Sequence, residues 1–343
     1  MSAPIRVLVV DDSAFARKVL REVLTRSGEV EVVGTARDGL EALEKFVELK
    51  PDVMTLDLVM PNLDGIGVLD ALGVSDRARV VIVSTAAGES ELAISALALG
   101  AFDLVSKPTA LATARLYEMG AELLLKVRAA AAASWRVEPA EHGARKSIPP
   151  AAHEGPRKLV VIGTSTGGPQ ALTRLLTTLP ADFPLPIAAA LHIPAGYTDA
   201  LARRIDQAAA LEVVEAENGV ELRPGRAVIA RGGDHLRLLM REHQLTGRLS
   251  KVPSDSVHFP SVDVLFQSAV DLYGAGVVGV VLTGMGDDGC KGAAAIHHAG
   301  GFVITEAAHS CVVYGMPRAV MEAGFSNAEV SLYDLAEYLS GKL

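Results

Sequence analysis

Short apolar runs alternate with segments of helical spacing in both halves of this chain of 343 residues. Apolar runs of roughly four to eight residues predict buried strands. Strands that alternate with helices predict parallel sheets covered by helices. The composition agrees with such a fold, because half of the residues are apolar and only 4% are aromatic.

The first half predicts a doubly wound, five-stranded parallel domain over residues 1–130. Its expected strands are Ile5–Val10, Val30–Thr35, Asp52–Leu56, Val80–Val83 and Leu104–Val105. Its expected helices are Ala14–Arg26, Leu40–Lys50, Glu89–Leu99 and Leu111–Ala133.

Residues 131–156 differ in composition from the regions on either side. They combine mixed charges and little apolar periodicity with four prolines, Pro139, Pro149, Pro150 and Pro156. This composition predicts a linker. Its length indicates that the flanking domains can change their relative position, and a passive spacer is the alternative.

Residues 157–343 predict a second doubly wound α/β domain with a mainly parallel sheet and a β-hairpin. Its expected strands are Leu159–Ile162, Ile187–Leu191, Val277–Leu282 and Phe302–Thr305. Its expected helices are Gln170–Leu179, Ser261–Leu272, Lys291–Ala299 and Pro317–Glu322. The hairpin is expected among the short segments Ala227–Ile229, His235–Met240 and Leu249–Val252.

Charge and cysteine content narrow the class of protein. The net charge of −9 argues against nucleic acid as a partner, because phosphate binding needs a cationic surface. Cys290 and Cys311 do not suggest a disulfide framework or a metal cluster. Because there is neither a signal peptide nor an apolar run of membrane-spanning length, we expect a cytoplasmic protein without membrane insertion. A monomer is the default expectation.

Acidic residues follow two expected strands of the first domain. Asp11 and Asp12 come after the first strand, and Asp57 comes after the third. Because the carboxyl ends of parallel strands share one edge, these carboxylates should converge, and Mg²⁺ suits such a set of oxygen ligands. Ser84 and Lys107 end the next two strands on the same edge. Each residue alone could be a helix cap or a solvated charge, but five converging residues favour a binding site.

This constellation resembles the receiver domain of bacterial response regulators. The resemblance covers roughly residues 5–130 and rests on Val9-Val10-Asp11-Asp12-Ser13, Asp57-Leu58-Val59-Met60-Pro61 with Asp64-Gly65, Val83-Ser84 and Ser106-Lys107-Pro108. It implies that Asp57 accepts a phosphoryl group from a histidine kinase. It also implies that Asp11 and Asp12 hold Mg²⁺ together with Asp57, that Ser84 senses the phosphate and that Lys107 contacts it. Leu104 departs from the pattern, because receivers commonly carry a switch aromatic at this position.

The second domain carries a serine between glycines, directly after an apolar run. The stretch Gly163-Thr164-Ser165-Thr166-Gly167 matches G-x-S-x-G, which places a serine hydroxyl on a tight strand-to-helix turn. Glycine-rich turns of this kind also bind phosphate, and that alternative stays open here. A nucleophilic serine needs a base, and His192 is the best placed because it follows the strand Ile187–Leu191. His258 and His309 remain candidates by position.

A third group is expected in the glycine-rich turn Thr283-Gly284-Met285-Gly286-Asp287-Asp288-Gly289. A carboxylate there could orient the histidine, with helix capping as the competing role. The resulting order Ser, His, Asp differs from the Ser, Asp, His order of α/β-hydrolases, which would require a late histidine such as His297, His298 or His309.

This domain resembles the chemotaxis protein-glutamate methylesterases. The matching motifs are the serine turn, the acidic turn 282–289, His192-Ile193-Pro194-Ala195-Gly196-Tyr197, Pro260-Ser261-Val262-Asp263-Val264-Leu265-Phe266 and Val313-Tyr314-Gly315-Met316-Pro317. The resemblance implies the triad Ser165, His192 and Asp288. We expect the amides near Thr166 and Met285 to hold the oxyanion. Phe259 departs from the family, which often has a basic residue there.

The combined resemblance implies a phosphorylation-activated serine esterase. It would hydrolyse γ-glutamyl methyl esters on chemoreceptors, release methanol and deamidate receptor glutamines, and we expect its recruitment to receptor clusters. The unphosphorylated receiver should cover part of the active-site edge, and phosphorylation of Asp57 should weaken that contact or favour receptor docking. Alternatives are a scaffold with a vestigial triad and a general small-molecule esterase or amidase. A DNA-binding output domain does not fit the acidic balance or the missing helix-turn-helix pattern.

Overall fold

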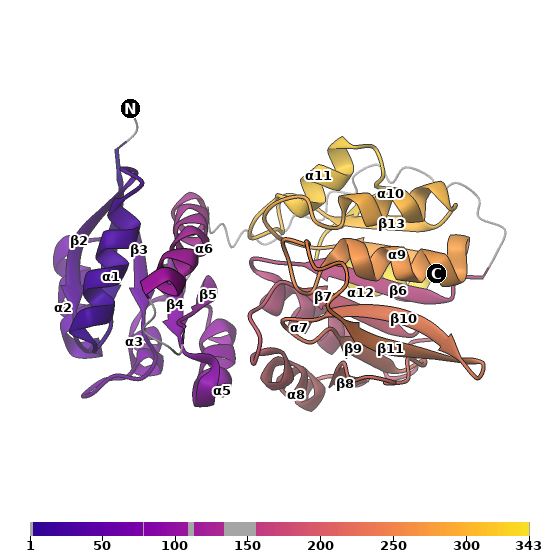
Figure 1. The fold of residues 1–343 in the computed structure, drawn as a ribbon, viewed down its shortest axis with the longest axis horizontal. Coiled ribbons are helices and arrows are strands. Elements are labelled where there is room, and N and C mark those ends of the chain that lie inside the picture. Colours follow the sequence, from indigo (N-terminus) through magenta and orange to yellow (C-terminus); the bar gives the residue numbers. More distant parts are fainter. Residues whose placement is uncertain (1–2, 78, 109–112, 134–155, 343) are drawn as a thin grey trace. The chain divides into compact units, whose positions relative to one another are not determined.

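The structure is a computed structural model that describes residues 3–77, 79–108, 113–133 and 156–342. Its contacts divide the chain into two compact units, Met1–Val137 and Glu138–Leu343 (Figure 1). Most of the predicted linker lies outside the described residues, so the domain boundaries at 130 and 157 remain predictions. No helix in the described part of the chain has the length and apolar character that a membrane span requires.

The first unit contains a five-stranded parallel sheet in the order β2-β1-β3-β4-β5. Helices α1 and α6 pack together on one face, and α2, α3 and α5 cover the other. The strands are β1 (Ile5–Val10), β2 (Val30–Ala36), β3 (Val53–Leu56), β4 (Val80–Ser84) and β5 (Asp103–Ser106). The helices are α1 (Ala14–Thr25), α2 (Gly39–Leu49), α3 (Gly65–Ala71), α4 (Val74–Arg77), α5 (Ala86–Ala98) and α6 (Thr113–Ala132).

The second unit contains a seven-stranded parallel sheet in the order β14-β13-β12-β6-β7-β9-β8. Helix α10 packs against α9 and α11 beside the sheet, while α7 contacts α8 and α12. The strands are β6 (Leu159–Thr164), β7 (Ile187–Leu191), β8 (Glu212–Glu215), β9 (Arg226–Ile229), β12 (Val277–Val281), β13 (Phe302–Glu306) and β14 (Ala328–Val330). The helices are α7 (Gly168–Thr178), α8 (Thr198–Ala208), α9 (Val262–Tyr273), α10 (Cys290–His298), α11 (Met316–Glu322) and α12 (Leu335–Lys342), with a 3₁₀ turn η1 (Gly274–Gly276).

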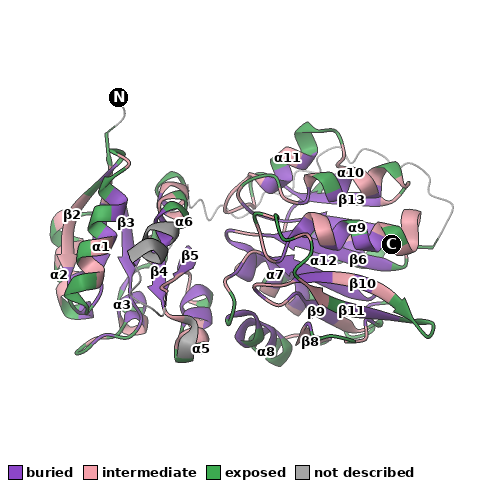
Figure 2. Ribbon diagram, viewed as in Figure 1, coloured by how far each residue is buried: buried purple, intermediate pink, exposed green. Residues whose placement is uncertain are grey.

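The two sheets form the buried cores of their units, as the purple strands in Figure 2 show. Strands β6, β7, β12 and β13 are buried along their whole length. A strand that is buried on both faces is apolar throughout rather than alternating, which is why these runs were recognisable in the sequence. The predicted fold class is confirmed, including the small antiparallel hairpin.

The hairpin differs in detail from the prediction. It is formed by β10 (His235–Arg241) and β11 (Gln244–Ser250), with Glu242 and His243 in the two-residue turn. The expected strand Leu249–Val252 was therefore placed too late. Both turn residues have positive φ angles, 48° and 69°. Such turns usually carry Asn-Gly or Asp-Gly, so the sequence Glu242-His243 did not predict one here.

Ala227–Ile229 does not belong to this hairpin, contrary to the prediction. It lies in β9, which pairs in parallel with β7 and β8 in the main sheet. A short apolar run fits an antiparallel hairpin and a parallel sheet equally well, and only the pairing partner separates the two.

Candidate active site and phosphoacceptor pocket

Ser165 is the first residue beyond β6, in the turn that leads into α7. Its side chain is partly exposed, whereas Thr164, Thr166 and Gly167 around it are buried. Gly167 caps α7 with φ 76°, a left-handed conformation that favours glycine. A Cβ at Gly167 would also lie 2.6 Å from the Cβ of Val312. The glycine therefore allows the tight turn that presents Ser165 at the sheet edge.

His192 occupies the equivalent position on the neighbouring strand. Thr164 and Leu191 are partners in the β6–β7 register, and the His192 amide donates to the Thr164 carbonyl at 3.1 Å. Ser165 and His192 are therefore the next residues along two hydrogen-bonded strands. This confirms that both reach the same sheet edge.

Asp288 lies against His192, with 2.7 Å between Asp288 Oδ2 and His192 Nε2. Three donors at the start of α9 hold the carboxylate: the Ser261 hydroxyl at 3.0 Å and the Val262 and Asp263 amides at 2.8 and 3.0 Å. Burial opposes its ionisation, but the hydrogen bond and charge of His192, with the amides of α9, lower its pKa. Asp288 is thus an anion at neutral pH.

The other ring nitrogen of His192, Nδ1, is the one that could accept a proton from Ser165. His192 Nδ1 is buried, and the described residues provide no hydrogen-bond partner for it. Within this part of the chain no hydrogen bond joins Ser165 to His192. Because Nε2 is engaged by Asp288, Nδ1 is left to accept a proton.

Two amides near Ser165 are available to a ligand. Ser165 donates its own amide to the Thr283 carbonyl at 3.0 Å, which fixes the serine turn against the acidic turn. A Cβ at Gly284 would lie 2.8 Å from Ser165 Cβ, so only glycine permits this approach. Among the described residues, the amides of Thr166 and Met285 have no acceptor.

His258 stacks on the imidazole of His192. The ring centroids are 3.9 Å apart and the planes differ by 12°. The sequence indicated His258 only as a possible base in place of His192, and a stacking contact leaves no signal in the spacing of residues. The late histidines do not lie at this site. His297 and His298, at the end of α10, contact the ring of Phe325, and His309 is exposed.

Phe259 stands where the family that this domain resembles often has a basic residue, and its ring packs against another side chain. Its ring stacks on that of His235, with centroids 4.4 Å apart. His235 is completely buried and its Nδ1 accepts the Ser261 amide at 3.1 Å. Phe259 thus supports the segment that enters α9, next to the residues that hold Asp288.

In the first unit, the predicted acidic residues converge. Ligand oxygens of Asp11, Asp12 and Asp57 lie within 4.8 Å of one another, which fits the carboxylate donor set that Mg²⁺ prefers. Lys107 Nζ lies 2.7 Å from Asp11 Oδ2 and 2.6 Å from Asp57 Oδ2. Burial, with a smaller effect of the Asp11 charge, raises the pKa of Asp57 to about 6 against the opposing effect of Lys107.

Ser84 lies at the same edge and has a partner that the sequence did not reveal. Its hydroxyl donates to the Glu89 carboxylate, which also accepts the Thr85 amide at 2.9 Å. Burial disfavours the Glu89 anion, but these hydrogen bonds and the charge of Lys107 lower its pKa. A phosphoryl group on Asp57 would compete with Glu89 for the Ser84 hydroxyl.

Leu104 is buried, with 1% of its surface exposed. Its carbonyl accepts a hydrogen bond from Lys126 of α6 at 2.5 Å. The position of the usual switch aromatic is therefore part of the apolar core.

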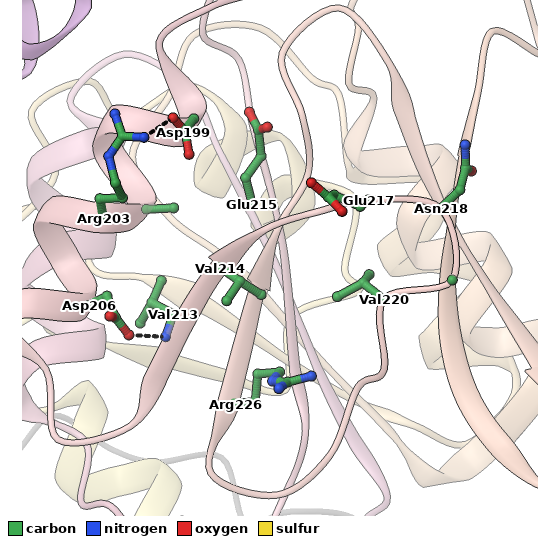
Figure 3. A pocket seen from close by; sticks show the side chains of 12 residues that line it. Asp199, Arg203, Asp206, Val213, Val214, Glu215, Glu217, Asn218, Val220 and Arg226 are labelled. Carbon is green, nitrogen blue, oxygen red and sulfur yellow. Dashed lines mark hydrogen bonds and ion pairs between the residues drawn. The ribbon is translucent and has the colours of Figure 1, made fainter.

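A separate surface hollow of about 580 Å³ lies between α8 and β8 (Figure 3). Its charged groups have partners within the hollow or just outside it: Asp199 pairs with Arg203 and Asp206 accepts the Val213 amide, while Glu215 pairs with Arg231 and Arg226 with Glu212. None of the predicted site residues lines it.

Comparisons with known proteins agree with this arrangement. Residues 160–339 match the CheB methylesterase family, and residues 7–118 match the response regulator receiver domain. The chain is 62% identical over 333 residues to protein-glutamate methylesterase/protein-glutamine glutaminase 5 of Myxococcus xanthus, covering 96% of this chain and 95% of that protein. It is 41% identical over 341 residues to the Thermotoga maritima protein-glutamate methylesterase/protein-glutamine glutaminase, covering 98% and 97%.

Among solved structures, the crystal structure of the Thermotoga maritima CheB methylesterase catalytic domain aligns with a TM-score of 0.53 at 40% identity, covering 55% of this chain and 99% of that one. The family match spans more than half of the chain, the relatives span nearly all of it, and both resemblances recognised in the sequence are confirmed. The chain belongs to the CheB methylesterase family, with a receiver domain preceding the methylesterase domain.

Proposed function

We propose that this protein is a phosphorylation-activated protein-glutamate methylesterase and glutaminase that acts on chemoreceptors. The single observation that supports this most strongly is the contact between His192 and the anion Asp288, next to Ser165 on adjoining strands. The names of the relatives supply the substrate class.

In the proposed reaction, Ser165 Oγ attacks the γ-carbonyl carbon of the methyl ester while His192 Nδ1 takes the hydroxyl proton. Asp288 stabilises the imidazolium. The amides of Thr166 and Met285 donate hydrogen bonds to the oxyanion. These hydrogen bonds are stronger in the transition state because the carbonyl oxygen then carries negative charge. The C–O bond to the methoxy group then breaks, and His192 returns the proton so that methanol leaves.

Water attacks the remaining glutamyl ester of Ser165, with His192 again as the base. The products are a free glutamate side chain and the regenerated serine. A glutamine side chain follows the same steps with ammonia as the leaving group, which accounts for deamidation.

In the receiver, Asp57 accepts the phosphoryl group from a histidine kinase. Asp11, Asp12 and Asp57 would hold Mg²⁺, which neutralises negative charge on the phosphoryl group when it is bound. Lys107 contacts the phosphoryl oxygens, and Ser84 turns from Glu89 toward them. We place the protein in the cytoplasm as a monomer recruited to receptor clusters.

Methanol release from methyl-labelled receptor membranes tests this function. Wild type should release methanol and Ser165→Ala should not. Release that persists at the wild-type rate in Ser165→Ala would refute the proposed nucleophile. Hydrolysis of simple esters without release from receptors would favour a general esterase.

A further inference from the structure

The carboxyl group of Glu306 is completely buried at the end of β13, beside the proposed active site. None of the catalytic steps above uses it. Among the described residues it has no cationic partner. Burying an ionised acid without a counter-ion is costly unless it is well hydrogen-bonded or remains neutral, so its contacts are informative.

Glu306 is hydrogen-bonded to the residue that anchors Ser165. Its Oε2 accepts the Thr283 amide at 2.8 Å. The carbonyl of Thr283 in turn accepts the Ser165 amide at 3.0 Å and the Thr164 hydroxyl at 2.7 Å. Thr283 therefore connects the buried carboxyl group to the backbone of the nucleophile.

The segment that follows β13 is hydrogen-bonded to Glu306 and to the turn that contains Thr283 and Gly284. Glu306 Oε1 accepts the Ser310 hydroxyl at 3.0 Å. Further along, the Val313 carbonyl accepts the Gly284 amide at 3.0 Å, and the Met316 amide donates to the Gly284 carbonyl at 2.8 Å. Glu306 thus joins the end of β13, the segment that follows it and the turn that carries the Met285 amide.

We propose that Glu306 is a positioning residue whose neutral carboxyl group fixes Ser165 and the Met285 amide for ester hydrolysis, so that its ionisation lowers esterase activity. This inference rests on the proposed function, and it adds a control of the reaction by pH within the catalytic domain.

The surroundings of Glu306 favour the neutral form. Burial raises its pKa to about 7, although the Thr283 amide and Ser310 hydroxyl oppose this. Cys311 Sγ lies 3.8 Å from the Glu306 carbonyl oxygen, and burial together with the charge of Glu306 raises the pKa of that thiol. On β14, the Glu329 carboxylate accepts the Tyr314 hydroxyl at 3.2 Å, and its charge adds to the effect of burial that raises the pKa of Cys311 and of Tyr314.

The hydrogen bonds remain complete when Glu306 is protonated. Its hydroxyl can donate to Ser310 Oγ, which lies 3.1 Å from the Ala307 carbonyl and can donate there instead. The other oxygen still accepts the Thr283 amide. Ionisation would instead place a negative charge against the Thr283 amide of the turn that carries the Met285 amide, and a negative charge there disfavours a second negative charge on the oxyanion.

The test measures full-length wild type, Glu306→Gln and Glu306→Ala between pH 6 and 9. Two readouts are followed, methanol release and the rate at which a fluorophosphonate labels Ser165, which does not depend on the receptor substrate. Glutamine copies the neutral acid, since it can accept from Thr283 and donate to Ser310. The control is Glu329→Gln, an exposed acid on the adjacent strand.

We expect Glu306→Gln to match wild type near pH 6 and to exceed it about tenfold at pH 8, where a group with a pKa of about 7 is mostly ionised. Glu306→Ala should lower both readouts by about tenfold or more at every pH, because the turn loses its anchor. Glu329→Gln should follow the wild-type profile.

Two results would overturn the proposal: a Glu306→Gln profile that tracks wild type, or a Glu306→Ala variant as active as wild type. If Glu306→Ala does not fold, the profile of Glu306→Gln decides alone. Methanol release by Ser165→Ala at the wild-type rate would instead refute the proposed function, which keeps the two failures distinguishable.

Discussion

Asp57 and Asp288 occupy comparable places in the two units, and their environments give them opposite properties. Each follows a parallel strand that adjoins the first strand of its sheet, where the strand order reverses and ligands commonly bind. Asp57 lies with Asp11 around a single lysine, and its pKa is raised to about 6. Asp288 receives three hydrogen bonds from the start of α9 as well as His192, and its pKa is lowered.

The difference shows that the strand end determines where each carboxylate lies, whereas the neighbouring groups determine its pKa and therefore its chemical role. Asp57 is buried beside a second carboxylate, Asp11, and both share the ammonium of Lys107, which suits a residue that binds a cation and accepts a phosphoryl group. Asp288 is surrounded by donors, which suits a permanent anion that orients a histidine.

The largest effect is expected from Asp288→Asn. An amide cannot stabilise the imidazolium and favours the wrong tautomer, so kcat should fall by about 10³-fold or more. Steady-state methanol release measures it. The matched control is Asp287→Asn, which changes the exposed neighbouring carboxylate. Equal losses in both variants would show that the orienting role of Asp288 is misassigned.

A stability effect of about 3 kcal/mol is expected from Lys107→Met, because it leaves two buried carboxylates without their cation. Hydrogen exchange of the β1 and β3 amides in the full chain measures this. Lys45→Met, which removes a half-exposed i,i+4 pair with Glu41, should cost only about 0.5 kcal/mol. Added Mg²⁺ should restore part of the loss in Lys107→Met, and a loss as small as in Lys45→Met would contradict the account.

Glu306 allows a third test, on the pH dependence of stability. Its pKa is raised from 4.5 to about 7 on folding, so its stabilising contribution is complete below pH 4.5 and is lost as pH rises through 7. The loss amounts to about 3 kcal/mol. Urea unfolding of the catalytic unit at several pH values should show this decline in wild type and Glu329→Gln but not in Glu306→Gln. A decline that persists in Glu306→Gln would assign it to another group.

The smallest effect is expected at His258. Loss of a stacked ring should cost about 1 kcal/mol, so His258→Ala should reduce kcat roughly fivefold with little change in KM. His258→Phe keeps an aromatic ring and should remain close to wild type. If phenylalanine is as damaging as alanine, the role of His258 depends on its nitrogens rather than on stacking.

Much of the fold was predictable because buried parallel strands are apolar throughout. The strands β1, β3, β7 and β12 were located within one residue at each end. The three-residue β14, the edge strand β8 with its Glu-Val-Val-Glu sequence and the highly charged α8 were not predicted. In these elements the contacts of the folded chain outweigh a weak local pattern.

For the sites, the sequence indicated residues that follow strands in recognisable motifs, and the structure brings Asp11, Asp12, Asp57 and Lys107 together. It likewise joins His192 to Asp288. The contacts of Glu89 with Ser84, of His258 with His192 and of Glu306 with Thr283 were not predicted. Each depends on side-chain directions that residue spacing does not specify.

The most direct test of the central claim is methanol release from methyl-labelled receptor membranes with and without a small phosphodonor and Mg²⁺. Wild type, Asp57→Asn and Ser165→Ala are compared. The account predicts that phosphodonor raises release by wild type, that Asp57→Asn shows only the basal rate and that Ser165→Ala shows none. Stimulation of Asp57→Asn equal to that of wild type, or release by Ser165→Ala, would contradict it.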